Sequence, residues 1–327
     1  TTMNNDKIKV AVIGAGSMGQ NHIRIYSQLK DVELVGIYDL DVENGEKISQ
    51  AYQCKFFENI QNIIDEVDAV SVCTPSTTHY EIASYFIKNG IHCLIEKPLA
   101  TDEQDAKKLI SLSNAHNVKI LVGHVEQFNP AILQLKNILQ NGSFKINNIK
   151  ASRVGIGGAR ITDVGVVDDI MIHDLDIILS IVDEVPDTVS AAMVRNKTSQ
   201  SEDLCVAMMT FPSGIIADIT ASRITHKRNR ILEVDTDKGV FVLDYFTQEL
   251  ELHHHRKDVL EQDPLSELGT SVMDTRVEKI LLRRAEPLTT ELAHFISVIK
   301  EEVQPIVSGD QALKALKVAW IIKENLK

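Results

Sequence analysis

A glycine-rich stretch near the start of the chain constrains its fold more than any other feature. Gly14, Gly16 and Gly19 match the pattern G-x-G-x-x-G, with an apolar run at 8–13 before them and a helical pattern after them. The first glycine permits a tight turn, the second lets the backbone approach a pyrophosphate, and the third lets helix and strand pack closely. This context predicts a strand, a dinucleotide-binding loop and a helix whose N-terminus favours an anion.

An acidic residue at the end of the next apolar run indicates which dinucleotide the loop binds. Asp39 lies twenty positions beyond Gly19, where a carboxylate accepts hydrogen bonds from the hydroxyls of the adenosine ribose. A carboxylate at this point repels the 2′-phosphate of NADP, and Leu40 and Asp41 follow it rather than an arginine. The sequence therefore predicts NAD as the cofactor in preference to NADP.

The first 125 residues alternate short apolar runs with helical patterns. This alternation is typical of parallel strands that are joined by crossover helices. We expect strands at 8–13, 33–38, 69–73, 92–95 and 119–122. The pattern predicts an α/β fold in which residues 1–125 form a Rossmann domain with a doubly wound parallel sheet.

The pattern changes after Pro130, and we expect a second domain at 126–327, with C-terminal helices that can pack back on the first domain. Turn signals at 212–214 (Pro-Ser-Gly) and 237–239 (Asp-Lys-Gly) separate neighbouring runs of alternating or apolar residues. Such runs predict hairpins in a largely antiparallel open sheet, within an α+β domain. The expected elements are a helix ending near 140, strands at 146–154, 188–196, 204–211, 214–222, 230–235 and 239–244, and helices at 168–182, 288–302 and 309–325.

A lysine follows the fourth expected strand, in the sequence Glu96-Lys97-Pro98. The carboxyl ends of parallel strands form the edge where open α/β sheets bind their ligands. Because proline fixes the turn, Lys97 is presented toward a ligand. A lysine near an alcohol can hydrogen-bond its oxygen and stabilise the negative charge that develops as the proton leaves. The alternative is a surface lysine at a strand end.

A second loop with the same placement follows the third expected strand. Thr74-Pro75 ends this strand, and His79 lies four residues beyond Pro75. We expect these residues to lie on the nicotinamide side of the dinucleotide site. A proline-started loop followed by a histidine on a helix face is the alternative.

These motifs together resemble a known family. The glycine loop, the Thr-Pro loop with a following histidine, and Glu-Lys-Pro after the fourth strand are similar to the Gfo/Idh/MocA (glucose-fructose oxidoreductase/inositol dehydrogenase) family over nearly the whole chain. The resemblance implies a Rossmann domain and a second domain for substrate binding and oligomerisation, whose open sheet supports dimers or tetramers. It also implies oxidation of a sugar or cyclitol hydroxyl, with Lys97 between nicotinamide and substrate.

A polar stripe runs along the apolar helix expected at 168–182. On a helix that turns about 100° per residue, Asp169, His173, Asp176 and Ser180 share one face. Carboxylates are costly to bury unless they are paired or face water, so the stripe predicts part of an active site. Imidazole titrates near neutral pH, which suits His173 for accepting the hydroxyl proton while Asp169 orients it or binds a sugar hydroxyl. The alternative is a capped helix start with a core histidine.

Two further stretches indicate the substrate. Arg160, in the glycine-rich run 155–160, is placed to hold a phosphate together with Arg153, and a flexible surface loop is the alternative. Residues 124–130 and 160–169 resemble the branch of UDP-N-acetylglucosamine 3-dehydrogenases, although Gln127 stands where many family members have an arginine. Oxidation of the C3 hydroxyl of this nucleotide sugar is the leading expectation. An inositol or free-hexose dehydrogenase and a non-catalytic NAD-binding sensor are the alternatives.

Composition limits the partners. A formal net charge of −12 disfavours nucleic acid and anionic membranes as partners, so an anionic ligand must be held by a local cationic cluster. The polar start of the chain and the lack of a long apolar run indicate a cytoplasmic protein. Consecutive histidines at 253–255 point to alternate faces of a strand, so we expect no metal site there.

The expected site residues fall into three sets. Catalysis is assigned to Lys97, Asp169 and His173. Cofactor binding is assigned to Gly14, Gly16, Ser17, Met18, Gly19, Asp39, Thr74, Pro75, His79, Glu96 and Lys97. Substrate binding is assigned to Lys97, Arg160, Asp169 and His173.

Overall fold

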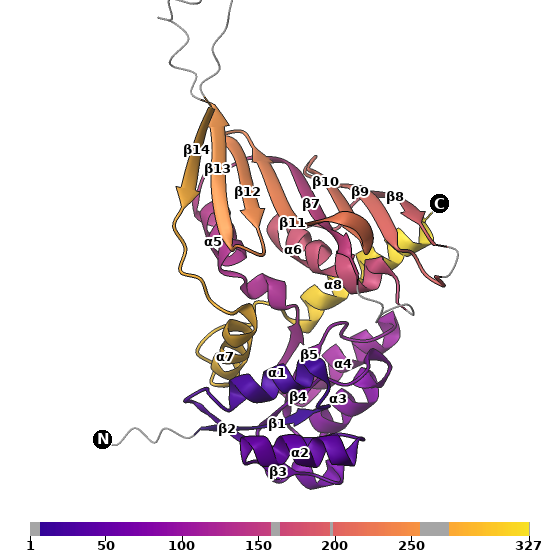
Figure 1. Ribbon diagram of the computed structural model, residues 1–327, viewed down its shortest axis with the longest axis vertical. Helices are drawn as coiled ribbons and strands as arrows, with labels where there is room; N and C mark the ends of the chain where they lie inside the picture. Colours follow the sequence, from indigo (N-terminus) through magenta and orange to yellow (C-terminus); the bar gives the residue numbers. More distant parts are fainter. Residues whose placement is uncertain (1–6, 158–163, 197–198, 256–274, 327) are drawn as a thin grey trace, which may run out of the picture. The chain divides into compact units, whose positions relative to one another are not determined.

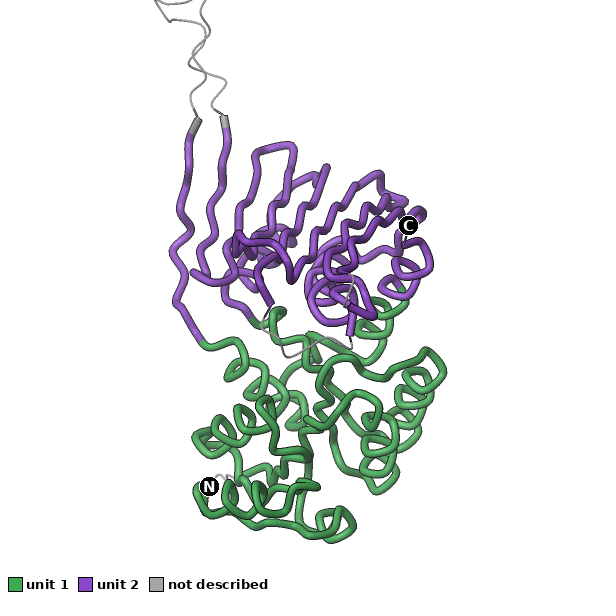
Figure 2. Tube along the Cα trace, turned by 45° about the vertical axis from the view of Figure 1, so that its right-hand side comes forward, with its two compact units in different colours: residues 1–128, 286–317 green, residues 129–285, 318–327 purple. Residues whose placement is uncertain are grey.

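The computed structural model describes residues 7–157, 164–196, 199–255 and 275–326, which belong to two compact units (Figure 1, Figure 2). The first unit comprises residues 1–128 and 286–317, and the second comprises 129–285 and 318–327. Helix α7 (Pro287–Ile299) lies in the first unit, and α8 (Gly309–Glu324) runs from the first into the second. Residues far along the chain therefore complete the unit that begins with the glycine loop.

The first unit is built on a six-stranded parallel sheet in the order β3-β2-β1-β4-β5-β6. Five strands confirm the predicted ones: β1 (Ile8–Ile13), β2 (Val32–Tyr38), β4 (Ala69–Val72), β5 (His92–Glu96) and β6 (Ile120–Gly123). The sixth, β3 (Lys55–Phe56), has only two residues and leaves no periodic pattern in the sequence. The strand order reverses between β1 and β4, and a doubly wound sheet binds its ligand at such a point.

Helices and short helical turns link these strands. They are α1 (Ser17–Tyr26), α2 (Val42–Tyr52), η1 (Ile60–Ile63), η2 (Ser76–Thr78), α3 (His79–Lys88), α4 (Glu103–Ala115) and η3 (Val125–Phe128). The Asp41 and Asp102 carboxylates accept hydrogen bonds from backbone amides in the first turns of α2 and α4, which fixes where these helices begin. Buried strand residues such as Val12, Val70 and Leu94 form the core beneath them.

The second unit contains an eight-stranded sheet in the order β14-β13-β12-β11-β7-β10-β9-β8. All neighbouring strands are antiparallel except β7 and β10, so the largely antiparallel sheet is confirmed. The strands are β7 (Ile146–Ile156), β8 (Thr188–Val194), β9 (Leu204–Thr210), β10 (Ile216–Ser222), β11 (Ile224–Thr236), β12 (Gly239–Asp244), β13 (Glu249–His255) and β14 (Thr275–Ile280). The sequence pattern did not predict β13 and β14.

Turn chemistry and side-chain alternation set the register of this sheet. The predicted turns are confirmed by Gly214 and Gly239, whose φ angles of +85° and +145° favour glycine. Along β9, Ala207 and Met209 are buried, whereas Val206 and Met208 are exposed. Helices α5 (Pro130–Asn141) and α6 (Ile172–Val182) contact the sheet through β12 and β13 and through β7 and β10. One face of the sheet therefore carries helices, and the other carries exposed apolar side chains.

Candidate active site

The glycine loop has the close contacts that its pattern predicts. Gly14 directly follows β1 with φ +94°, and a Cβ atom added to it would lie 2.7 Å from the carbonyl oxygen of Cys73 at the end of β4. A Cβ added to Gly19 would overlap the carbonyl of Gly14. A Cβ added to Gly16, by contrast, has no protein atom within 4 Å. Gly14 and Gly19 are thus required by packing, whereas Gly16 leaves open space for a ligand.

Helix α1 begins at this loop without a side-chain cap. Its N-cap, Gly16, has an extended backbone and no side-chain hydrogen bond, and its first turn carries no acidic residue. The next two residues, Ser17 and Met18, are exposed. Uncapped first-turn amides and the positive end of the helix dipole attract anions. The loop is therefore suited to the pyrophosphate of a dinucleotide.

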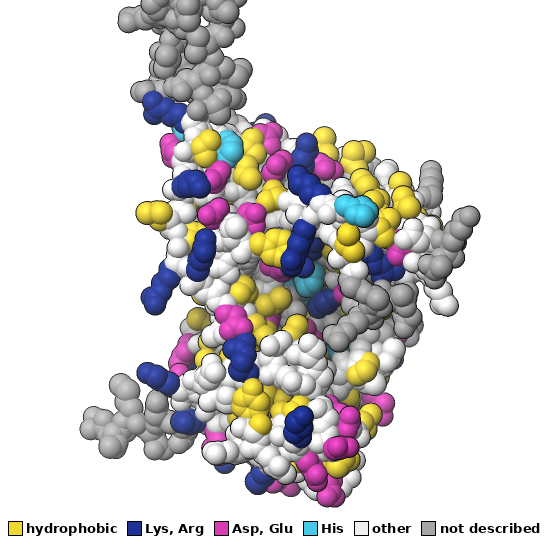
Figure 3. Space-filling view, in the orientation of Figure 1, with side chains coloured by type: hydrophobic (Ala, Val, Ile, Leu, Met, Phe, Trp, Pro, Cys, Tyr) yellow, Lys and Arg dark blue, Asp and Glu magenta, His cyan; other side chains and the backbone are white. Residues whose placement is uncertain are grey.

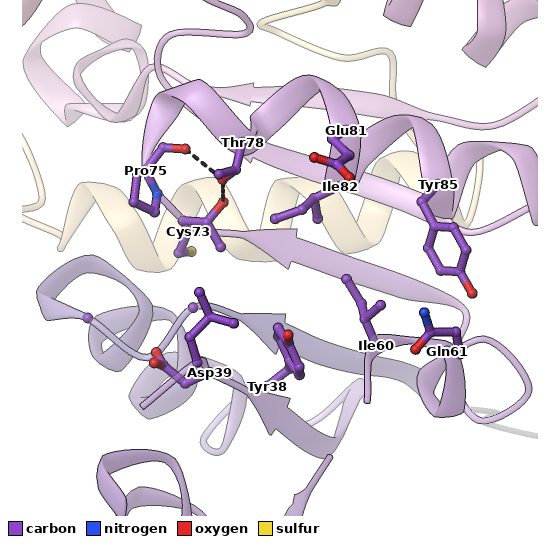
Figure 4. A pocket seen from close by; sticks show the side chains of 14 residues that line it. Tyr38, Asp39, Ile60, Gln61, Cys73, Pro75, Thr78, Glu81, Ile82 and Tyr85 are labelled. Atoms are coloured by element: carbon purple, nitrogen blue, oxygen red, sulfur yellow. Dashed lines mark hydrogen bonds between the residues drawn. The ribbon is translucent and has the colours of Figure 1, made fainter. Parts of the chain in front are cut away.

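A cavity of about 680 Å³ opens beside the loop (Figure 4). Figure 4 shows Thr78, Ile82 and Tyr85 of the η2–α3 segment on one side, with Asp39 and Ile60 on the others. The full lining is Gly14, Gly16, Tyr38, Asp39, Leu40, Ile60, Gln61, Cys73, Thr74, Pro75, Thr78, Glu81, Ile82 and Tyr85. Its walls are mostly apolar, and the carboxylates of Asp39 and Glu81 are among the lining residues; this combination suits a flat base attached to a ribose.

The Asp39 carboxylate is fixed by two backbone amides. Its Oδ2 accepts a hydrogen bond from Ala15 N at 2.5 Å, and its Oδ1 accepts one from Asp41 N at 2.8 Å. The end of β2 is thereby tied to the glycine loop. Each oxygen has further lone pairs for ligand hydroxyls. The negative charge that the sequence predicts at this edge of the sheet is therefore part of the cavity wall.

The Thr74-Pro75 loop and the Lys97-Pro98 turn are joined through His79. This side chain is buried, with Nδ1 2.8 Å from the Pro98 carbonyl oxygen and Nε2 2.9 Å from the Thr74 carbonyl oxygen. The Thr78 hydroxyl adds bonds of 2.8 Å to Thr74 Oγ1 and to the Pro75 carbonyl, which Figure 4 shows as dashed lines. Because protein carbonyls engage both ring nitrogens, the geometry supports a positioning role for His79.

Glu96 and Lys97 are adjacent in sequence but differ in their surroundings. Glu96 is buried, and its Oε1 accepts a hydrogen bond from His22 Nε2 at 3.0 Å. A Cβ added to Gly123 would lie 2.9 Å from the Glu96 carboxyl group, so the next strand needs glycine there. Lys97 is half-buried at the end of β5. The pattern missed His22, which lies on α1 three residues beyond Gly19.

Asp169 and His173 lie in the second unit, on a helix that starts irregularly. Residues Val167–Met171 form a π-helical turn, and α6 follows from Ile172. The predicted helix at 168–182 is confirmed, although its first residues form a π-helical turn, in which each residue advances by a smaller angle than in an α-helix. His173, Asp176 and Ser180 keep helical spacing within α6. Asp169, His173 and Ser180 are half-buried, and Asp176 is buried.

A polar cluster from the connections between strands anchors the start of this helix. Glu202 Oε1 accepts a hydrogen bond from Val167 N at 3.1 Å, and the Glu202 carbonyl accepts one from Val166 N at 3.1 Å. Arg223 donates to Asp203 Oδ1 and to the carbonyl of Val164, both at 2.7 Å. The sequence pattern did not predict this cluster, because the residues between β8 and β9 match no known motif.

Of the two arginines predicted to hold a phosphate, the structure describes Arg153 alone. Arg153 is buried and forms a two-point ion pair with Asp174 of α6, at 2.9 and 3.0 Å. Its guanidinium also lies 4.5 Å from the ring centre of Tyr245. The prediction for Arg153 was therefore wrong, because its charge is used within the core. Arg160 lies outside the residues that the structure describes.

The consecutive histidines at 253–255 belong to β13. His253 and His254 contact Glu251 and Glu278 at 2.9 Å each, on opposite faces of β13. Within the described ranges, no group of three or more His, Cys, Asp or Glu side chains is arranged to hold a metal ion. No described helix is both long and apolar enough to cross a membrane.

Comparison with known proteins agrees with this geometry. Residues 8–124 match the family model described as "Oxidoreductase family, NAD-binding Rossmann fold", and 157–242 match "GFO/IDH/MocA C-terminal domain". The UDP-N-acetylglucosamine 3-dehydrogenase of Acidithiobacillus ferrooxidans is 28% identical over 316 residues, covering 97% of this chain and 96% of that protein. The inositol 2-dehydrogenase of Rhizobium meliloti is 25% identical over 331 residues, covering 95% and 94%.

A solved structure extends the similarity to the fold. The structure of the Acidithiobacillus ferrooxidans enzyme matches with a TM-score of 0.87 and 26% identity, covering 98% of both chains. Both units are thus represented in one relative. The uncapped glycine loop, the lysine-bearing turn and the matches to both domain models lead to one assignment: the chain is an oxidoreductase of the Gfo/Idh/MocA family with an NAD-binding Rossmann domain.

Proposed function

We propose that the protein is an NAD-dependent dehydrogenase that oxidises the C3 hydroxyl of UDP-N-acetylglucosamine to a 3-oxo group. The observation that carries the proposal is the cavity beside Gly16, where open space at the loop meets the Asp39 carboxylate. The choice of substrate is supported by the similarity to the Acidithiobacillus ferrooxidans enzyme, which extends over 97% of this chain. The experiment below separates this substrate from its competitors.

The residues of the first unit fit NAD in a specific way. The amides after Gly16 would hold the pyrophosphate, and the apolar wall that includes Ile60 and Ile82 would enclose the adenine. The Asp39 carboxylate would accept hydrogen bonds from the ribose hydroxyls and repel a 2′-phosphate. NAD is therefore preferred over NADP.

Catalysis is assigned to three side chains. Bound NAD supplies a hydride acceptor. Lys97 donates a hydrogen bond to the reacting hydroxyl oxygen and stabilises its growing negative charge. His173 accepts the hydroxyl proton, and Asp169 orients the imidazole or binds a neighbouring hydroxyl. His79 and the His22–Glu96 pair hold the loops that carry Thr74 and Lys97.

Oligomerisation forms part of the proposal. The second sheet leaves Val194, Val206, Met208 and Ile216 exposed on its helix-free face. Contiguous exposed apolar side chains mark protein interfaces. We therefore expect a homo-dimer or homo-tetramer formed through this face.

The decisive experiment is a substrate panel followed by the absorbance of reduced nicotinamide. Purified protein is incubated with NAD or NADP and with UDP-N-acetylglucosamine, myo-inositol or free glucose. We expect turnover of the nucleotide sugar with NAD, at least tenfold above every other combination in kcat/KM. Turnover of inositol or glucose without turnover of the nucleotide sugar would overturn the substrate assignment. NAD binding without turnover of any sugar would favour a sensor.

A further inference from the structure

The second unit carries two arginines on one exposed aromatic ring. The Arg228 guanidinium carbon lies 4.3 Å from the ring centre of Phe246, and that of Arg230 lies 4.6 Å from the same centre. Both arginines belong to β11, and Phe246 follows β12 with 43% of its surface exposed. Cation–π contact fixes both flexible side chains in place. We call Arg228, Arg230 and Phe246 the arginine–phenylalanine cluster.

The charge of this cluster is unusual for the chain that carries it. The chain has 46 acidic and 34 basic residues, yet two guanidinium groups share one neutral ring here. Arg228 is exposed and forms no ion pair with the residues that the structure describes. An exposed guanidinium group that forms no ion pair can bind an anion. Figure 3 shows other Lys and Arg side chains among apolar ones over the second unit.

Strand register relates the cluster to the helix that carries the proposed catalytic residues. Arg230 lies directly opposite Arg153 across β11 and β7, so the two side chains leave the same face of the sheet. Arg153 pairs with Asp174 of α6, which identifies this face as the one that α6 covers. The cluster and His173 therefore share one face of the second sheet.

The stem of the Arg228 side chain lies beside the neighbouring strand β7. A Cβ added to Gly155 of β7 would lie 3.6 Å from Arg228 Cγ. The regular pairing of β11 with β7 is interrupted between Ile224 and Asn229, so Arg228 lies on an irregular stretch of its strand. The exposed Arg228 side chain therefore extends from a part of β11 that is not regularly paired with β7.

We propose that the arginine–phenylalanine cluster binds the phosphate group of the substrate. Guanidinium groups present planar pairs of donors that match phosphate oxygens in two-point hydrogen bonds. The inference rests on the proposed function, because it names the part of the nucleotide sugar that the second unit recognises. The same chemistry suits the diphosphate of a nucleotide sugar and the phosphate of a sugar phosphate. A neutral cyclitol would make no use of the cluster.

Direct binding measurements test this assignment without requiring turnover. The full-length protein is first saturated with NADH, so that phosphate probes do not enter the dinucleotide site. UDP and glucose 6-phosphate are then titrated by calorimetry into the wild type and into the variants Arg228→Gln, Arg230→Gln and Arg283→Gln. Arg283 is an exposed arginine between β14 and α7, so it provides a matched control. Thermal unfolding verifies that each variant is folded.

The expected result is that Arg228→Gln and Arg230→Gln each weaken probe binding by about ten- to a hundredfold, the usual loss for hydrogen bonds to a charged group. Arg283→Gln should bind as the wild type does. A loss for UDP alone identifies the diphosphate as the ligand, and a loss for glucose 6-phosphate alone identifies a sugar phosphate. Unchanged binding of both probes by folded Arg228→Gln and Arg230→Gln proteins would overturn the inference.

The two proposals fail in different ways. If UDP-N-acetylglucosamine is not oxidised but UDP binding depends on Arg228, the proposed function is wrong and the phosphate site stands. If the nucleotide sugar is oxidised with an unchanged KM in Arg228→Gln and Arg230→Gln, the function stands and the phosphate site is wrong.

Discussion

Lys97 is held at the end of β5 by contacts of its neighbours rather than by the strand alone. Glu96 is fixed from α1 by His22 at 3.0 Å, and the carbonyl of Pro98 is fixed by His79 at 2.8 Å. Each contact joins a side chain on a helix to a residue beside Lys97. A hydrogen-bond donor that is already held in position loses little conformational freedom when it binds the reacting oxygen. This small entropic cost is the reason that a fixed lysine favours catalysis.

Removing the Lys97 charge should slow catalysis far more than it weakens cofactor binding. Lys97→Met keeps the length and apolar stem of the side chain, so we expect kcat for the nucleotide sugar to fall by about a hundredfold or more. NADH fluorescence titration should give a dissociation constant within about twofold of the wild type, since the glycine loop and Asp39 are unchanged. Lys88→Met, at an exposed lysine of α3, is the control. Wild-type turnover by Lys97→Met would remove the lysine from the mechanism.

Among single residues, the sequence predicted those whose role depends on the backbone conformation of their own segment. Gly14, Gly19 and Asp39 could be found because strand, turn and helix follow one another in the chain. The His22–Glu96 contact could not be found, because it joins residues 74 positions apart. The error at Arg153 has the same origin, since its partner Asp174 becomes visible only once β7 and α6 pack together.

At the scale of the element, the π-turn at Val167–Met171 depends on hydrogen bonds from outside its own helix. A 100° helical wheel predicted the polar face from α-helical geometry, and that geometry holds within α6. Asp169 lies before α6, within the wider π-turn. Hydrogen bonds from Val166 N and Val167 N to Glu202 stabilise this irregular start. No local sequence pattern predicts these bonds, because the acceptor, Glu202, lies in the distant connection between β8 and β9.

A larger side chain at Gly165 should lower stability and kcat/KM without changing NADH binding. A Cβ added to Gly165 would overlap the Glu202 carboxylate, so Gly165→Ala forces the turn or Glu202 to move. We expect a loss of about 1–3 kcal/mol in the free energy of unfolding, as for overpacked sites, and a fall in kcat/KM. Glu202→Gln keeps an acceptor oxygen and should have a smaller effect. NADH titration should be unchanged in both variants, and unaltered stability in Gly165→Ala would contradict the account.

Asp203 gives the same anchor a predictable pH dependence. Burial raises the pKa of its carboxyl, but hydrogen bonds from Asn196 N, Arg223 and Ser199 outweigh this and leave the pKa below its ordinary value of 3.8. Because the pKa is lower in the folded state, the carboxylate stabilises the protein above about pH 4. That contribution is lost as the pH falls through the folded-state value.

Urea unfolding of the wild type and Asp203→Asn at several pH values measures this contribution. We expect the wild type to be more stable by about 1–2 kcal/mol at pH 7. The difference should shrink once the pH falls below about 4, because the carboxyl becomes protonated. Ser190→Ala, on the exposed face of β8, serves as a control whose effect should not vary with pH. A difference between wild type and Asp203→Asn that is constant from pH 7 to pH 3 would contradict the assignment.

At the scale of the whole molecule, the sequence predicted the kind of sheet in each of the two units. The doubly wound sheet and the largely antiparallel sheet follow from alternation and turn residues. Strand β3 has only two residues, which is too short to show a period. Strands β13 and β14 were not predicted, although glutamate and leucine alternate at the start of β13. Residues 286–317 join the first unit, and only long-range packing decides such a placement. Burial raises the pKa of the free Cys205 thiol to about 12.

The helix-free face of the second sheet predicts how copies of the chain associate. Met208, 52% exposed, lies in register with Asp218 of β10, near the exposed Val206. We expect light scattering after gel filtration to give two or four times the chain mass. Met208→Glu places a charge in this face and should shift the population toward the monomer. Val303→Glu, at another exposed apolar residue in the first unit, should leave the mass unchanged. A wild-type monomer would refute this interface.

Isotope transfer tests the central claim most directly. The protein is incubated with NAD and UDP-N-acetylglucosamine that carries deuterium at C3, and the reduced cofactor is analysed by mass spectrometry. The account predicts that the reduced cofactor is one mass unit heavier than the product from unlabelled substrate, and that the Lys97→Met protein yields almost none. Reduced cofactor without deuterium, or no reduction by the wild type, would contradict the claim that this chain moves a hydride from C3 of the nucleotide sugar to NAD.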